Sequence, residues 1–110
     1  GLIGIRILAA GALTGSAARH PVAMQDVPPI ASGPSFAADV AAANRLAPLV
    51  AEGVAGSLAE LALRYAIFAP GMGCALIGTA SLGQLEEAIA AARRGPLPPA
   101  AVERIGALLA

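Results

Sequence analysis

The segment from Cys74 to Arg94, CALIGTASLGQLEEAIAAARR, constrains the fold more than any other part of the chain. A short apolar run ends at Gly78 and Thr79 and passes directly into a helical pattern that opens at Ser81. This order predicts a strand whose C-terminal end leads straight into a helix. In barrels and doubly wound α/β proteins, phosphate-bearing ligands bind at such junctions, because unpaired backbone amides and the positive end of the helix dipole converge there. The segment therefore predicts a part in holding a nucleotide.

A second apolar run, residues 3–10, predicts another strand near the start of the chain. Its isoleucines and leucines fall on both parities, so we expect both of its faces to be covered, as in a parallel sheet. Residues 1–15 would then hold this strand and a loop of small residues. Residues 16–35 carry Pro21, Pro28, Pro29 and Pro34 and predict a long irregular loop. A loop of this length is unusual unless it is functional or packs on a partner, so we expect it to cover another part of the structure or a partner.

The rest of the chain predicts helices around one more strand. Residues 36–70 predict a helix pair: the first helix is disturbed near Pro48, and the second opens at Ser57 with the capping-box spacing Ser-x-x-Glu. Residues 72–78 predict the second strand, and residues 81–95 a helix with a second capping box from Ser81 to Gln84. Residues 98–109 predict a final amphipathic helix.

This order of elements predicts an α/β fold with two parallel strands and about four helices. One βαβ unit of this kind leaves both sheet edges unpaired and much apolar surface uncovered. Stable monomers avoid such surfaces. We therefore expect residues 1–110 to form a single partial domain of a larger structure.

Composition excludes several function classes. All seven basic residues are arginine, so Schiff-base chemistry and a Walker lysine are excluded. The formal net charge is zero, which argues against a nucleic-acid partner. Glycines and prolines interrupt the uncharged stretch 65–85, so no membrane span is expected. Cys74 is the only cysteine and His20 has no partner at metal-ligand spacing, so we predict no intrachain disulfide, no metal site and, by default, a cytoplasmic protein.

Three stretches of the sequence resemble a known family. They are GIRILAAGALTG, SLAELALRYAIFAPGMGCALIGTASLGQLEEAIAA and GPLPPAAVERIGAL. Together they resemble the C-terminal portion of the aldo-keto reductase family, and the resemblance covers nearly the whole chain. It implies a C-terminal βαβα fragment of a (β/α)8 TIM barrel that contains the last two strands. It also implies NADP or NAD as cofactor.

The resemblance also implies which residues contact the cofactor. In the family, the loop after the first of these strands closes over the pyrophosphate, and the loop and helix after the second hold the adenosine half. The corresponding residues here are Leu8, Ala9 and Gly11 in the first loop, and Gly78, Ala80, Gln84 and Glu87 in the second. Ile5 stands where the family often has an aromatic residue against the nicotinamide. Because Ala80 and Ala88 replace polar contacts, the choice between NAD and NADP stays open.

The catalytic set of the family, Asp, Tyr, Lys and His, lies on earlier strands of the barrel. No residue of this chain is assigned to it: Tyr65 is expected to pack in the core, and Cys74 to be an inert apolar residue within its strand. We therefore expect a catalytically incomplete chain that binds the cofactor weakly or not at all by itself. Its expected partner is an N-terminal barrel portion. The alternative is a non-enzymatic oligomerising module that completes its sheet with other copies or with a partner chain.

Overall fold

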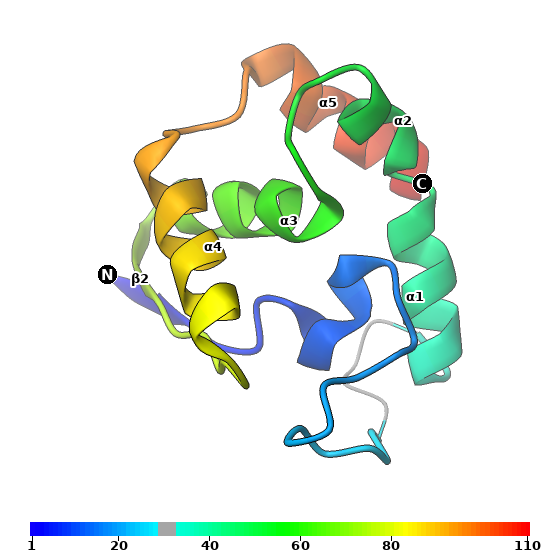
Figure 1. Ribbon diagram of the computed structural model, residues 1–110. Coiled ribbons are helices and arrows are strands. Elements are labelled where there is room, and N and C mark those ends of the chain that lie inside the picture. Colours follow the sequence, from blue (N-terminus) through cyan, green and yellow to red (C-terminus); the bar gives the residue numbers. More distant parts are fainter. Residues whose placement is uncertain (29–32) are drawn as a thin grey trace.

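The computed structural model describes residues 1–28 and 33–110, in which two short strands lie side by side at the edge of a largely helical structure (Figure 1). Strand β1 (Leu2–Gly4) pairs with β2 (Met72–Ala75), and the two run parallel. The ladder continues past β2, since the Leu76 amide donates to the Gly4 carbonyl at 2.8 Å. The two parallel strands expected from the sequence are thus confirmed.

Helices make up about half of the described chain, and α3 lies at their centre. It packs against β2, α4 and the short 3-10 helix η1, while α1 packs against η1. Long segments therefore connect the two strands across the helical layer (Figure 1). The helices are η1 (Ala9–Thr14), α1 (Phe36–Asn44), α2 (Ala47–Ala51), α3 (Leu58–Ile67), α4 (Leu82–Arg93) and α5 (Pro99–Leu109).

Both predicted capping serines begin their helices. The Ser57 side chain accepts a hydrogen bond from the Glu60 amide at the start of α3, and the Ser81 side chain accepts one from the Gln84 amide at the start of α4. In the usual capping box, the side chain three residues after the cap accepts a hydrogen bond from the amide of the cap residue itself. Here the Glu60 and Gln84 side chains instead accept from the amide of the residue before the cap. Glu60 accepts from the Gly56 amide at 3.0 Å in this way. Each cap satisfies helix amides that would otherwise lack a partner.

The first strand is shorter and more exposed than predicted. Residues 3–10 do not form one strand: β1 ends at Gly4, and Arg6 takes up a left-handed conformation with φ of 54°. A strand cannot continue through that conformation, so the chain turns into η1. Leu2 and Ile3 are 61% and 67% exposed, so the expectation that both faces would be covered is wrong for this chain. The reason is that the sheet has only two strands among the described residues.

Three further details differ from the sequence predictions. The second strand stops at Ala75 instead of reaching residue 78. The break predicted near Pro48 is present: α1 ends at Asn44, and Pro48 lies in the first turn of α2, where a missing amide costs nothing. Cys74 is exposed, and Tyr65 is 47% exposed instead of packing in the core. Pro29, part of the predicted loop 16–35, lies outside the described residues.

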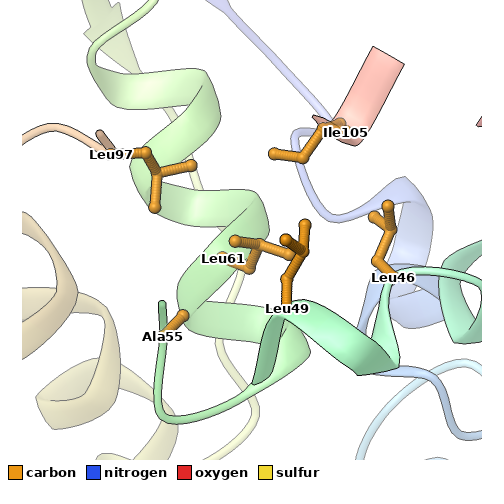
Figure 2. Packing of buried hydrophobic residues seen from close by; sticks show 6 residues of the cluster. All are labelled: Leu46, Leu49, Ala55, Leu61, Leu97 and Ile105. Carbon is orange, nitrogen blue, oxygen red and sulfur yellow. The ribbon is translucent and has the colours of Figure 1, made fainter. Parts of the chain in front are cut away.

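The main hydrophobic core lies between α2, α3 and the C-terminal part of the chain. Leu49 and Leu61 are its most deeply buried side chains, at 0% and 1% exposure. They pack with side chains that precede α3 and with Leu97 and Ile105, which follow α4, so the core joins residues far apart in the sequence (Figure 2). The cluster consists of Leu46, Leu49, Ala55, Leu61, Leu97 and Ile105.

The chain exposes more surface than its mass predicts. Its accessible area is 6484 Å², whereas a folded monomer of this mass exposes about 5,500 Å². The excess of roughly 1,000 Å² is similar to one side of a standard protein interface. Large apolar side chains contribute to it, among them Ile5 at 66% and Leu82 at 70% exposure.

Candidate functional site

The junction after β2 begins the candidate site. Residues 76–80 carry the chain from β2 to Ser81, which caps α4. The Ser81 hydroxyl accepts from the Gln84 amide at 3.2 Å, and the Gln84 side-chain oxygen accepts from the Ala80 amide at 2.7 Å. Two of the amides at this helix start are therefore already bonded to side chains of the chain itself.

The loop after β1 forms the opposite wall of the site. Arg6, Ala9 and Ala10 have left-handed backbones, with φ of 54°, 48° and 55°. Hydrogen bonds within the loop hold this shape: the Ala9 amide donates to the Arg6 carbonyl at 2.8 Å, and the Gly11 amide donates to the Leu8 carbonyl at 2.9 Å. Non-glycine residues avoid the left-handed region, where each costs about 1–2 kcal/mol. The loop is therefore a strained segment stabilised by its surroundings.

A cavity of about 570 Å³ lies between these two walls. Its lining comes from three parts of the chain: residues within 6–23, Ala59 and Leu63 of α3, and residues within 76–88. Cavities of a few hundred Å³ that join several segments are typical of ligand sites.

Six of the seven residues that the sequence analysis assigned to the cofactor line this one cavity. The exception is Ala9, which is buried at 9% exposure and is not part of the lining. The structure thus brings the two predicted loops together, while contacts of these residues with a cofactor stay a prediction. The six lining residues are Leu8, Gly11, Gly78, Ala80, Gln84 and Glu87.

Glu87 has a structural partner at the edge of the cavity. Its carboxylate accepts a hydrogen bond from the Ser57 hydroxyl at 3.1 Å, so it links α4 to the N-terminal cap of α3. Ser57 also caps α3 through the Glu60 amide at 3.0 Å. Glu87, the only carboxylate among the described residues of the cavity lining, is therefore engaged with a neutral hydroxyl.

No function in the site was assigned from the sequence to the three basic side chains of this cavity. Arg6, Arg19 and His20 all line it. Arg19 donates to the carbonyl of Ala10 in the strained loop and to the carbonyl of Met24. No pattern in the sequence places the proline-rich segment against the strained loop, since its residues follow no helical or strand period. The cations of this site come from that segment and from the end of β1, instead of from the loop before α4.

A cluster of two arginines around the buried Glu60 carboxylate holds α3 to the end of α4 and to the chain that follows it. Arg64 of α3 is 6% exposed and donates to the Glu60 carboxylate at 3.0 Å. Arg94, at the end of α4, approaches the two Glu60 oxygens to 3.0 and 3.1 Å. Burial alone would raise the pKa of Glu60. The Gly56 amide, Arg64 and Arg94 outweigh this effect and hold that pKa below its ordinary value.

A comparison with models of protein families finds a match over the whole given sequence. The model of the aldo/keto reductase family matches residues 1–110. This chain belongs to the aldo/keto reductase family. No significant match to a curated protein or to a solved structure was found.

Membership of the aldo/keto reductase family supports an oxidoreductase-like function and, in general, NAD(P)H as cofactor. The family has the TIM-barrel fold, and the described strands and helices agree with the α/β class. Within residues 1–28 and 33–110, no helix has both the length and the apolar character needed to cross a membrane.

Proposed function

We propose that this chain is the C-terminal, cofactor-binding part of an aldo/keto reductase-like oxidoreductase that uses NAD(P)H. The observation that carries the proposal is the single cavity between the loop after β1 and the start of α4. Residues assigned from two loops more than 60 positions apart line it together. In this assignment, the loop after β1 holds the diphosphate, and the segment from Gly78 to Glu87 holds the adenosine half.

The residues of the cavity fit such a group. The volume of about 570 Å³ falls within the range of about 300–1,000 Å³ that is usual for ligand sites. Two arginines and one carboxylate line it, so its formal charge is positive. An anionic ligand suits that balance. When bound, NAD(P)H supplies the hydride for carbonyl reduction; the residues of this chain bind and orient it.

We further propose that the chain does not complete the chemistry alone. The family resemblance implies an Asp, Tyr, Lys and His set, and this chain has no lysine. Its single tyrosine, Tyr65, lines a different cavity of about 130 Å³ near Phe68 and Val102. No described residue is therefore assigned as catalytic, and the missing groups would come from preceding strands of a barrel.

The exposed strands support a partner that completes the sheet. Leu2, Ile3 and Ile5 are each more than 60% exposed, and β1 and β2 have no further neighbouring strand among the described residues. We propose an N-terminal barrel portion as this partner. The second candidate, a non-enzymatic module that pairs its strands with other copies, is favoured by the same exposed strands. Light scattering separates the two: a chain that assembles into defined oligomers supports the second, and a chain that folds cooperatively as a monomer contradicts it.

Titration of the 15N-labelled chain with NADPH and NADH, followed by amide chemical shifts, tests the proposal. We expect saturable shifts in residues 6–20 and 78–88, no shifts in α5, and weak affinity, because the other half of the site is not preorganised. Matched titrations with adenosine report the adenosine half separately. Shifts scattered over the whole surface would contradict the assigned site. Carbonyl reduction by the chain, after contaminating reductases are excluded, would contradict catalytic incompleteness.

A further inference from the structure

We propose that Arg6 and Arg19 form a two-arginine clamp that binds the diphosphate of a dinucleotide in the 570 Å³ cavity. The inference rests on the proposed function and deepens it. It assigns the recognition of the phosphates to guanidinium side chains, instead of to the backbone amides of the two loops.

Arg19 is held in place before any ligand arrives. Its guanidinium donates to the carbonyls of Ala10 and Met24, and its carbon centre lies 5.7 Å from the centre of the Phe36 ring. These two bonds use Nη1 and Nε, whereas a guanidinium has five N–H donors in a fixed fork. The remaining donors can serve an anion in the cavity that Arg19 lines. Because the side chain is already ordered, binding an anion costs little further rotamer entropy.

Arg6 reaches the same cavity from the end of β1. Its backbone φ of 54° is left-handed, which a glycine or asparagine would adopt more easily. Its carbonyl accepts from the Ala9 amide, and this bond helps to keep the loop in the turn that follows. A charged, exposed residue in a strained conformation at a cavity wall suggests a functional reason for its presence.

The backbone donors of the two loops are less suited to the phosphates. The amides of Ala9 and Gly11 bond to carbonyls within their loop, and the amides of Ala80 and Gln84 bond to capping side chains. An anion would have to break these bonds before it could use the amides. The guanidinium groups need no such exchange, and their forked donors match the paired oxygens of phosphate groups.

The charges around the clamp favour a polyanion. Within the part of the chain that the structure describes, Glu87 is the one carboxylate of the lining, and it is bonded to the Ser57 hydroxyl. His20 also lines the cavity, and its Nδ1 accepts from the Val22 amide at 3.2 Å. Since Nδ1 accepts this bond, Nε2 is the ring nitrogen of His20 that can donate a hydrogen bond to a ligand. The described lining therefore offers two arginines and one imidazole donor against one carboxylate.

Chemical-shift titrations with inorganic pyrophosphate and with NADPH test the clamp on the full chain. The variants are Arg6→Gly, Arg19→Ala and Arg19→Lys, and the matched control is Arg45→Ala, which removes one positive charge from an exposed site outside the cavity. Arg6→Gly removes the cation and also relieves the left-handed strain, so this variant is expected to be at least as stable as the parent chain. Circular dichroism checks the fold of each variant. Arg19→Lys keeps the charge but loses the fork.

We expect pyrophosphate to shift the Nε–H signals of Arg6 and Arg19 in the parent chain. Arg6→Gly and Arg19→Ala should each weaken binding about tenfold or more, because each removes charge-assisted hydrogen bonds. Arg19→Lys should be intermediate, and Arg45→Ala should bind like the parent. Absence of pyrophosphate binding by the parent chain, or binding by Arg6→Gly or Arg19→Ala that is as tight as that of the parent chain, would overturn the clamp.

The NADPH titrations separate this inference from the proposed function. If NADPH binds and neither arginine substitution weakens it, the clamp is wrong and the proposed cofactor site stands. If pyrophosphate binds through both arginines but NADPH and adenosine do not shift residues 78–88, the clamp stands and the proposed function is wrong.

Discussion

Replacement of Arg64 by methionine should destabilise this chain more than other single substitutions of its polar residues. Methionine keeps much of the length and the packing of the side chain but removes every donor. Arg64 is 6% exposed and donates to the Glu60 carboxylate at 3.0 Å. It also donates to three carbonyls, those of Gly95 at 2.9 Å, Pro96 at 3.0 Å and Val54 at 3.1 Å.

The size of the loss follows from these contacts. Each carbonyl that loses its donor costs about 1 kcal/mol, and breaking a buried ion pair costs about 3–5 kcal/mol when the remaining charge has no partner. Glu60 keeps Arg94 and the Gly56 amide, so the ion-pair part should fall below that range. We expect a loss of about 3–5 kcal/mol in total. Since domains of this size have a free energy of unfolding of about 5–15 kcal/mol, the substitution should remove a large part of it.

Urea unfolding at pH 7, followed by far-ultraviolet circular dichroism, measures this loss as a lower midpoint at unchanged slope. The control is Arg104→Met, which breaks an exposed ion pair with Glu52 and should leave the midpoint nearly unchanged. The double variant Glu60→Gln/Arg64→Met should be more stable than the sum of the two single losses predicts, because it leaves no buried carboxylate short of a cation. A loss below about 1 kcal/mol for Arg64→Met would refute the reasoning.

Three further predictions concern the strained and charged positions. Because the pKa of Glu60 lies below its ordinary value of 4.5 in the folded chain, Glu60 stabilises the fold above pH 4.5, and this contribution is lost as the pH falls through the folded pKa. In the Glu60→Gln variant, the urea midpoint should therefore fall less steeply as the pH is lowered below 4.5 than it does in the parent chain. The same steepness in both chains would contradict this. Gly15→Ala should destabilise by about 1–3 kcal/mol in the same assay, since φ is 78° and the new Cβ would lie 2.6 Å from a Leu58 methyl carbon; a neutral effect would argue against the loop geometry. Ala10→Gly should stabilise by about 0.5–1 kcal/mol, because it relieves a left-handed alanine, and a lower thermal midpoint would count against strain there.

Local sequence rules predicted the helices well because the signals for helix ends are short-range. Ser57 and Ser81 cap their helices through the side-chain bonds that the capping-box spacing indicates. Gly53 and Gly95 follow helices with φ of 83° and 78°, as expected of glycines at helix ends. Each of these features is decided by residues within one helical turn, so the sequence contains the information needed to place them.

The predicted length of the first strand was wrong, because its end is decided by contacts distant in the sequence. The apolar run over residues 3–10 satisfies the pattern of a buried strand, but the left-handed backbones at Arg6 and Ala9 end it early. No pattern of side chains in the sequence predicts a positive φ at an arginine. That conformation depends on the Ala9 amide meeting the Arg6 carbonyl and on the packing of η1 against α1 and α3. Such determinants are tertiary, and local pattern rules do not contain them.

The sequence predicts the two loops that form the walls of the candidate site, but it does not predict which charged side chains line it. Gly11 and Gln84 could be assigned because strand-to-helix junctions and the family resemblance identify them from local motifs. Arg19 could not, because it lies in an irregular segment, and only the folded chain places it against Ala10 and in the cavity lining. The loop before α4, residues 76–80, contains no cation, so the sequence alone does not decide between NAD and NADP. The structure places the cations on the opposite wall.

With the cations on the opposite wall, the junction between β2 and α4 has a different part in ligand binding from the one that the sequence indicates. The sequence predicts an anion site built from free helix amides at this junction, yet the amides of Ala80 and Gln84 are bonded to the Gln84 and Ser81 side chains. An amide that already has a partner offers a ligand only the difference between two hydrogen bonds. In the proposed site, the start of α4 therefore supplies shape and neutral polar contacts for the adenosine half. The charged recognition falls to Arg6 and Arg19, which lie where the strained loop and the proline-rich segment meet the cavity.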